Sequence, residues 1–204
     1  MSRVRTRPTR DETRDKLFEA ATRVFEEQGI GSASIEAIAA AAGFSRGAFY
    51  SNFKSKDELI TAMLEDHVER SIERHLDLLA EHNNIDDFLN ALKSMDRSKQ
   101  DPLGRAPLLH MEMILFVARA EKRRPELAKR LRARRKLVTD IVETSLKDSG
   151  RPAALNPAWT AAIVLALEDG FRLHRLIDPE TTPADGFLRA ISDLRRAMGI
   201  IATS

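Results

Sequence analysis

A short, weak helix carries the side chains of this sequence that are best suited to bind another molecule. The stretch "SRGAFYSNFKSK", residues 45–56, has few strong helix formers, and its glycine costs roughly 1 kcal/mol relative to alanine in a helix interior. Phe49 and Phe53 stand four residues apart, so they share one face and predict an attachment to neighbouring helices. The opposite face is made of small residues, Gly47, Ala48 and Ser51. A flat face of this kind can lie close to a large partner.

Hydrogen-bond donors and cations border this flat face. Arg46 and Tyr50 flank it on one side and Asn52 on the other, while Lys54 and Lys56 follow directly. Side chains of these types donate to the phosphate oxygens and base edges of DNA. The glycine would let the helix backbone come near a DNA groove, because it has no side chain. The stretch therefore predicts a DNA-binding surface.

A second helix precedes the weak one, and only Gly43 and Phe44 separate them. Its apolar residues recur with helical spacing from Ser34 onward. Two helices joined by so short a turn match a helix-turn-helix, whose second helix enters the major groove. Three serines begin the helices of this region, and the capped N-termini can face phosphates: Ser34, Ser45 and Ser55.

The chain begins with a basic segment. Residues 1–10 hold four arginines and no acidic residue. Such an arm either reaches nucleic acid or remains a solvated tail. Thr9 and Glu12 then form a capping box that opens a first helix, and Gly29 is expected to end it.

The composition is that of a globular protein in a reducing compartment. The chain has 204 residues, 43% hydrophobic and 31% charged, with a formal net charge of +2. It contains no apolar run near the roughly 20 residues that span a bilayer and no signal-peptide pattern, so no membrane partner is expected. The absence of cysteine excludes disulfides and thiol catalysis and favours the cytoplasm.

Neither an enzyme nor a metal or cofactor site is expected. The five histidines show no HxxxH, HxH or HExxH spacing, so no metal-binding residues are predicted. The sequence also lacks a glycine-rich phosphate loop, a GxSxG motif and an acid pair with a positional reason to be catalytic. We therefore predict no catalytic residues and no cofactor.

The rest of the chain predicts further helices and almost no strands. Apolar residues recur with a 3.6-residue period in six more segments: 55–82, 85–100, 108–118, 125–148, 158–177 and 184–198. The segment "DPLGRAP", residues 101–107, is expected to be a loop. The helix that follows it, residues 108–118, is apolar nearly all round and is expected to be central and buried.

The fold class is therefore all-α, with about nine helices in two bundles. A three-helix DNA-binding domain with a helix-turn-helix comes first, and a larger C-terminal helical bundle follows. We divide the chain into a basic N-terminal arm, a helix-turn-helix domain and a ligand-binding and dimerisation domain: residues 1–10, 11–56 and 57–204.

The pattern over about residues 12–60 resembles the DNA-binding domain of the TetR family of bacterial transcriptional regulators. Eight residues stand at matching positions of the family motif: Ser45, Arg46, Gly47, Ala48, Phe49, Tyr50, Phe53 and Lys56. The resemblance implies a transcriptional regulator, most often a repressor, that binds a near-palindromic double-stranded DNA operator as a homodimer. It also implies a small-molecule effector held in the C-terminal bundle.

The same resemblance assigns roles to single residues. Three would approach bases: Arg46, Gly47 and Ala48. Three others would hold phosphates: Ser34, Tyr50 and Lys56. The chain departs from the family pattern at Asn52, where the family usually has histidine, and asparagine can still donate to a phosphate.

The resemblance also implies a dimer interface built largely from the last two long helices, and their apolar residues agree with it. Residues 158–167 are apolar around the whole circumference of their helix, so one side must meet something other than the chain's own core. The final helix shows one apolar stripe: Phe187, Ile191, Leu194 and Met198. The alternative is that all of these residues belong to the core of a single chain.

Ionisable and soft apolar residues within the apolar helices are the candidates for an effector pocket. The set comprises His110, Met111, Glu112, Met113, Phe116, Trp159, Glu168, Phe171 and His174. A mostly hydrophobic effector with a few polar groups is expected. The acids favour a cationic or hydrogen-bond-donating one, unless arginines such as Arg172 pair with them. The alternative is that the methionines and phenylalanines are core residues.

Two other functions fit parts of the sequence. An architectural DNA-binding protein without a ligand would show little sequence discrimination and no ligand-dependent release. An all-α enzyme or interaction module that only resembles the motif would lack DNA affinity at low salt. The regulator is the leading hypothesis.

Overall fold

The expected all-α fold is confirmed. The computed structural model describes residues 9–82, 84–94, 102–148 and 156–197, and these form ten helices and no strand. The helices are α1 (Arg10–Ser32), α2 (Ile35–Ala41), α3 (Arg46–Tyr50), α4 (Lys56–Glu81), α5 (Ile85–Ser94), α6 (Pro102–Arg105), α7 (Pro107–Arg119), α8 (Arg124–Asp148), α9 (Pro157–Ile177) and α10 (Gly186–Ala197).

The chain divides into two compact units. The first comprises Met1–His67 and Arg97–Leu127, and the second comprises Val68–Asp96 and Ala128–Ser204. The first unit thus contains α6 and α7, which the sequence analysis assigned to the C-terminal domain. Helix α4 begins in the first unit and ends in the second.

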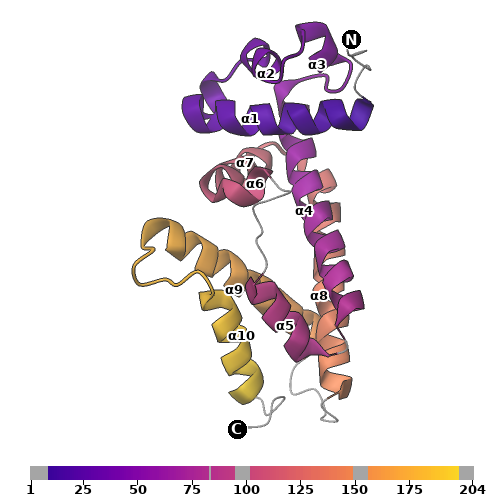
Figure 1. The fold of residues 1–204 in the computed structure, drawn as a ribbon, viewed down its shortest axis with the longest axis vertical. Helices are drawn as coiled ribbons and strands as arrows, with labels where there is room; N and C mark the ends of the chain where they lie inside the picture. Colours follow the sequence, from indigo (N-terminus) through magenta and orange to yellow (C-terminus); the bar gives the residue numbers. More distant parts are fainter. Residues whose placement is uncertain (1–8, 83, 95–101, 149–155, 198–204) are drawn as a thin grey trace, which may run out of the picture. The chain divides into compact units, whose positions relative to one another are not determined.

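The core of the first unit fixes the helix-turn-helix. Helix α1 lies between α2 and α3 on one side and α6 and α7 on the other (Figure 1). Its apolar stripe supplies Leu17, Phe18 and Phe25, which are at most 3% exposed. Ile38 of α2 and Phe49 of α3 are fully buried in the same cluster. This core therefore sets the position of the two short helices, which are too short to be stable alone.

The ends of α1 follow the sequence signals. The Thr9 hydroxyl accepts from the Glu12 amide at 3.2 Å, and the Glu12 carboxylate accepts from the Thr9 amide at 2.8 Å, so the expected capping box is confirmed. Gly29 has φ 76° and ψ 155° and interrupts the helix, after which one further turn runs to Ser32. A side chain at this φ would be strained, which accounts for the glycine.

Gly43 makes the turn between α2 and α3. Its φ is 75°, its amide donates to the Ala40 carbonyl, and the Phe44 amide donates to the Ala39 carbonyl at 2.9 Å. These two bonds form a Schellman motif, which requires the left-handed conformation that glycine adopts without strain. The sharp turn predicted from Gly43 and Phe44 is therefore present.

Two sequence expectations about the segment from 102 to 119 were wrong. Pro102–Arg105, within the segment expected to be a loop, forms the short helix α6. The helix expected to be buried all round, α7, buries only one face, while Leu108 is 61% and Leu115 is 53% exposed. Hydropathy alone cannot distinguish a helix that is buried all round from one that leaves leucines at the surface.

The second unit has a smaller core between α5 and α10. Phe88 and Leu92 of α5 pack with Leu188 of α10, and Ile141 of α8 packs against them. Helix α10 lies beside α9, to which a short connection joins it (Figure 1). The bounds of α8, α9 and α10 agree with the expected segments within a few residues, and Met198 lies outside the described residues.

Lys56→Ala is expected to destabilise the first unit. The Lys56 ammonium donates to the carbonyl oxygens of Ile30, Gly31 and Ala33 at 2.7, 3.2 and 2.8 Å, which uses all three of its N–H groups. Removing it leaves partly buried acceptors unpaired, at a cost of about 1–3 kcal/mol. Thermal unfolding of the variant should show a clearly lower Tm.

Lys54→Ala is the matched control, because Lys54 is exposed and two residues away. It should change the free energy of unfolding by no more than about 0.5 kcal/mol. Equal Tm values for the two variants would contradict a structural role for the Lys56 ammonium.

Candidate nucleic-acid interface and cavity

Two phenylalanines hold α3 in place. Phe49 and Phe53 are 0% and 1% exposed, and their ring centroids lie 5.8 Å apart. Phe53 also stacks on Phe18 of α1 at 5.8 Å, and the guanidinium carbon of Arg14 lies 5.2 Å from the Phe53 ring centroid. The buried face predicted from their spacing is thus present. The exposed face of α3 is correspondingly fixed in position.

Serine caps give the short helices their N-termini. The Ser34 hydroxyl accepts from the Ala37 amide at 3.0 Å, and the Ser45 hydroxyl accepts from the Ala48 amide at 3.2 Å. The Ser55 hydroxyl accepts from the Glu58 amide at 3.1 Å, whereas the Glu58 carboxylate accepts from the Lys54 amide. Ser34 and Ser45 are exposed, so both remain accessible to a phosphate.

Arg46 is exposed on α3 and held by two neighbours. Its Nη1 lies 2.9 Å from a Glu36 carboxylate oxygen of α2, and its Nη2 donates to the Tyr50 hydroxyl at 3.4 Å. The hydrogen bond with Tyr50 and the charge of Glu36 raise the pKa of Arg46, so the group stays cationic. Both side chains of the ion pair are more than half exposed, which keeps the pair weak and replaceable.

The other residues predicted to face DNA differ in whether their polar groups are exposed or already bonded within the chain. Gly47 is exposed and Ala48 half-buried, as a flat outer face requires. The Asn52 amide nitrogen donates to the Ala48 carbonyl at 2.9 Å, so one of its two N–H groups is already bonded to the backbone of α3. Lys54 is exposed, whereas the Lys56 ammonium contacts three carbonyls. The proposed phosphate contact of Lys56 would compete with these bonds.

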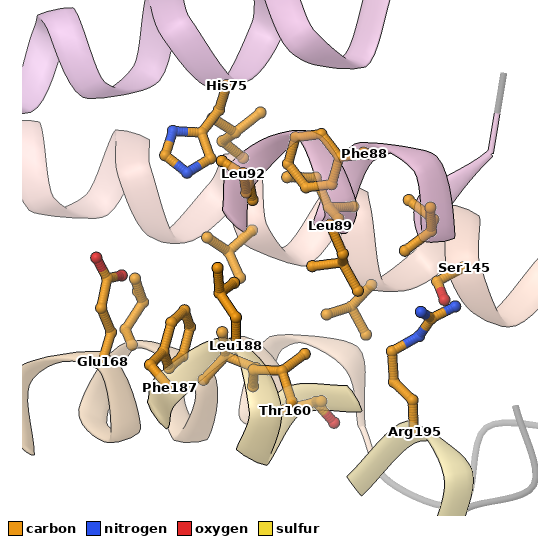
Figure 2. Close-up of a pocket in the computed structure, with 18 of the residues that line it drawn as sticks. His75, Phe88, Leu89, Leu92, Ser145, Thr160, Glu168, Phe187, Leu188 and Arg195 are labelled. Atoms are coloured by element: carbon orange, nitrogen blue, oxygen red, sulfur yellow. The ribbon is translucent and has the colours of Figure 1, made fainter. Parts of the chain in front are cut away.

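The second unit contains an apolar cavity of about 260 Å³. Residues of α4, α5, α8, α9 and α10 line it, and Figure 2 shows Phe88, Leu92, Phe187 and Leu188 among them. All three described residues of the stripe on α10, Phe187, Ile191 and Leu194, line this cavity. This stripe was expected to lie in a dimer interface.

Charged groups stand at two separate places on the cavity wall, and Figure 2 shows Glu168 and Arg195 at opposite ends. The Glu168 carboxylate accepts from Arg134 at 2.6 Å and from Arg172 at 3.0 Å. Arg195 Nη1 lies 2.6 Å from an Asp86 oxygen, and its buried Nε has no hydrogen-bond partner among the described residues.

Only Glu168 of the nine predicted effector residues lines this cavity. His110 and Met113 are buried in the first unit, where the His110 ring lies 4.4 Å from that of His67. In the same helix, Met111 and Phe116 are half-buried and Glu112 is exposed. Three more belong to α9: Trp159 is 64% exposed, Phe171 is half-buried, and His174 is exposed.

The cavity residues that the sequence analysis missed are ordinary aliphatic and aromatic residues. Ile72 of α4, Phe88 and Leu92 of α5 and Ile141 of α8 line the cavity. Ile72 and Ile141 fall on the 3.6-residue period of the segments 55–82 and 125–148, but nothing in that period distinguishes a cavity wall from a filled core. Arg195, near the end of the last helix, carried no signal beyond its charge.

A helix-turn-helix presenting an arginine on a short exposed helix defines a DNA-binding protein. The sequence comparisons make this assignment specific. The family described as bacterial regulatory proteins, tetR family, matches residues 17–63, and a tetracyclin repressor-like C-terminal domain matches residues 100–197. The chain belongs to the TetR family of DNA-binding transcriptional regulators.

Named relatives are similar to this protein over most of the chain. An uncharacterised HTH-type transcriptional regulator of Bacillus subtilis, YfiR, is 28% identical over 192 residues, 91% of each chain. The HTH-type transcriptional regulator UidR of Escherichia coli K12 is 25% identical over 162 residues, 78% of this chain and 79% of UidR. A TetR-family regulator from Cytophaga hutchinsonii shares the fold, with a TM-score of 0.72, 18% identity, and coverage of 98% and 100% of the two chains.

No helix in the described part of the chain is both long and apolar enough to cross a membrane.

Glu36→Gln is expected to strengthen binding to any DNA duplex. Glu36 places a carboxylate 2.9 Å from the Arg46 guanidinium, so DNA must displace it and also meet its negative charge. An exposed pair contributes up to about 1 kcal/mol, which corresponds to a gain in affinity of up to about fivefold at low salt. Fluorescence anisotropy with unrelated duplexes would measure it.

Glu27→Gln changes the net charge equally from the exposed surface of α1 and is the control. An equal gain in DNA affinity for both variants would show that the change in net charge alone accounts for it. A loss of affinity in Glu36→Gln would contradict competition between Glu36 and DNA for Arg46.

Proposed function

We propose that this protein is a transcriptional repressor that binds a near-palindromic operator as a homodimer and is released by a small, largely hydrophobic effector. The observation that carries the proposal is the course of α4. This helix buries Leu59 and Ile60 in the unit that holds the helix-turn-helix, and its later residues Ile72 and His75 line the cavity of the second unit. One continuous helix therefore belongs to both candidate sites.

The proposed response needs two states of α4 with different affinities for DNA. An effector that fills the cavity in only one arrangement of its walls shifts the population toward that arrangement. An effector that binds both arrangements equally has no effect, whatever its affinity. In a dimer, the two copies of α3 must meet successive major grooves about one helical turn apart, so a small shift of α4 can prevent simultaneous binding.

A stripe of apolar and small residues on α9 supports the proposed dimer. Six residues follow one another at intervals of three or four and form the stripe: Trp159, Ala162, Ala166, Gly170, Leu173 and Ile177. Trp159, Leu173 and Ile177 are 64%, 42% and 77% exposed in the single chain. The small residues between them would let a second helix approach closely. An exposed apolar surface of this kind is typical of a protein interface.

The proposed function is tested by identifying the operator and then releasing it. Sequencing genomic fragments retained by the purified protein would give the operator, and the genes beside it would suggest effectors. Retained fragments should share a near-palindromic sequence. Random retention, with no effector-dependent release, would support an architectural DNA-binding protein instead.

Arg46 and Lys54 are expected to contribute to DNA binding in different ways. Arg46→Ala should cost about 1–3 kcal/mol at one operator position if Arg46 reads guanine, and should relax the preference there. Lys54→Ala should weaken all duplexes alike and reduce the salt dependence by about one phosphate contact per protomer. Titrations at roughly 50–200 mM salt distinguish the two effects. An affinity that does not depend on salt would contradict the proposed DNA contacts.

Ala166→Glu is expected to break the proposed dimer. The substitution places a carboxylate in the middle of the stripe on α9, where the twofold arrangement would bring two like charges together. Sedimentation velocity at micromolar concentration should show dimers for the original chain and monomers for the variant. Ala133→Glu, on the exposed surface of α8, is the matched control and should remain dimeric. A monomeric original chain would refute the interface.

A further inference from the structure

We propose that the cavity of the second unit binds a small amphiphilic monoanion, with its acidic group at Arg195 and its apolar body between α5, α8 and α10. Such a ligand would be the effector of the regulator proposed above. Binding of the ligand does not depend on the proposed function, whereas release of the operator by the ligand rests on it. This ligand class reverses the preference for a cationic ligand that the acidic residues of the sequence suggested.

The acid that would attract a cation is already neutralised. Glu168 lies within 2.6 Å of Arg134 and 3.0 Å of Arg172, and all three side chains are at most 22% exposed. Two guanidinium groups surround the Glu168 carboxylate, and Asp169 beside it interacts with the same two arginines, so this end of the cavity offers no uncompensated negative charge. A cationic ligand would have to displace an arginine from a largely buried pair, which is costly.

Arg195, at the other end, has a donor left over. Its Nη1 donates to Asp86 across from α5, and the side chain is only 13% exposed. The buried Nε has no hydrogen-bond partner among the described residues. A buried donor without a partner is unfavourable, and an acidic ligand group would supply the missing acceptor.

The rest of the cavity wall is mainly apolar and suited to a chain or a ring, with a few polar side chains such as His75 and Thr160. Phe88, Ile141 and Leu188 belong to three helices and line the same space. The volume of about 260 Å³ lies just below the usual range for small-molecule sites, roughly 300–1,000 Å³. A guest of about octyl size with one acidic group matches the volume and the polarity together.

Three ligands with the same octyl chain test the charge preference. Octanoate, 1-octanol and octylammonium are titrated into the DNA-free protein by isothermal calorimetry below their aggregation limits. Octanoate should bind at least about tenfold more tightly than octanol, because a hydrogen bond to a charged group replaces an unpaired donor. Octylammonium should bind most weakly. Octanol binding as tightly as octanoate, or octylammonium binding best, would overturn the inference.

Variants at the two partners locate the acidic group. Arg195→Gln should lower octanoate affinity about 10–100-fold and leave octanol nearly unchanged. Asp86→Asn should raise octanoate affinity, because it removes the carboxylate that competes for the same guanidinium. Arg189→Gln, on the exposed side of the same helix, is the control and should behave like the original chain.

Each result decides the inference separately from the regulatory proposal. Equal octanoate affinity in Arg195→Gln and the original chain overturns the assignment of Arg195. If Arg195→Gln does not fold, the Asp86→Asn variant tests the assignment of Arg195 instead. Octanoate affinity in Asp86→Asn that is equal to or lower than that of the original chain overturns this assignment. Leu188→Phe fills the cavity and should abolish binding of both octanoate and octanol, whereas retained binding would place the site elsewhere. Arg195-dependent binding without operator release would support the ligand class and contradict the effector response.

Discussion

The packing of Phe49 and Phe53 against α1 is the contact on which the candidate DNA-binding surface depends. Helix α3 has five residues, and one of them is a glycine, so its own hydrogen bonds cannot keep it folded. The two rings, at most 1% exposed, supply the missing stability by burial. Phe49 lies on one side of α3 and Phe53 follows the end of the helix, so the exposed residues on the other side, Arg46 and Gly47, are the candidates for contact with DNA. A stronger helix former in place of Gly47 would add a side chain to that surface.

The sequence predicted this region closely because each of its signals is local. Capping serines, the glycine of a sharp turn and two aromatics four residues apart each specify backbone or burial over a few positions. The structure contains the Thr9 capping box, the turn at Gly43 and the buried face of α3. Local signals could not reveal which distant groups a long side chain contacts in the folded unit. Lys56 reaches back 26 residues along the chain to the Ile30 carbonyl, a contact that only the folded unit creates.

The cavity was predicted poorly for the opposite reason. Its wall comes from five helices, and each contributes residues that look like ordinary core residues in the sequence. Soft and ionisable residues inside an apolar helix directed attention to α7, yet His110 and Met113 belong to the packed core of the first unit. The stripe on α10 was recognised correctly as apolar, but periodicity cannot say whether a stripe faces another chain or the chain's own interior. Only the arrangement of α5, α8 and α10 decides that.

Both candidate sites place an arginine opposite a carboxylate from a neighbouring helix. Arg46 of α3 pairs with Glu36 of α2, and Arg195 of α10 pairs with Asp86 of α5. An anionic partner at Arg46 would exchange one carboxylate for another acceptor, whereas at Arg195 it would add an acceptor for the unpartnered Nε while Nη1 keeps its bond to Asp86. The environments of the two arginines also differ. Arg46 is 63% exposed, so water has already weakened its pair, whereas Arg195 is 13% exposed and its guanidinium is largely desolvated. The affinity for an anion should therefore exceed the affinity for a neutral molecule by a larger factor at Arg195 than at Arg46. At Arg46, contacts with many phosphates together must supply the affinity for DNA.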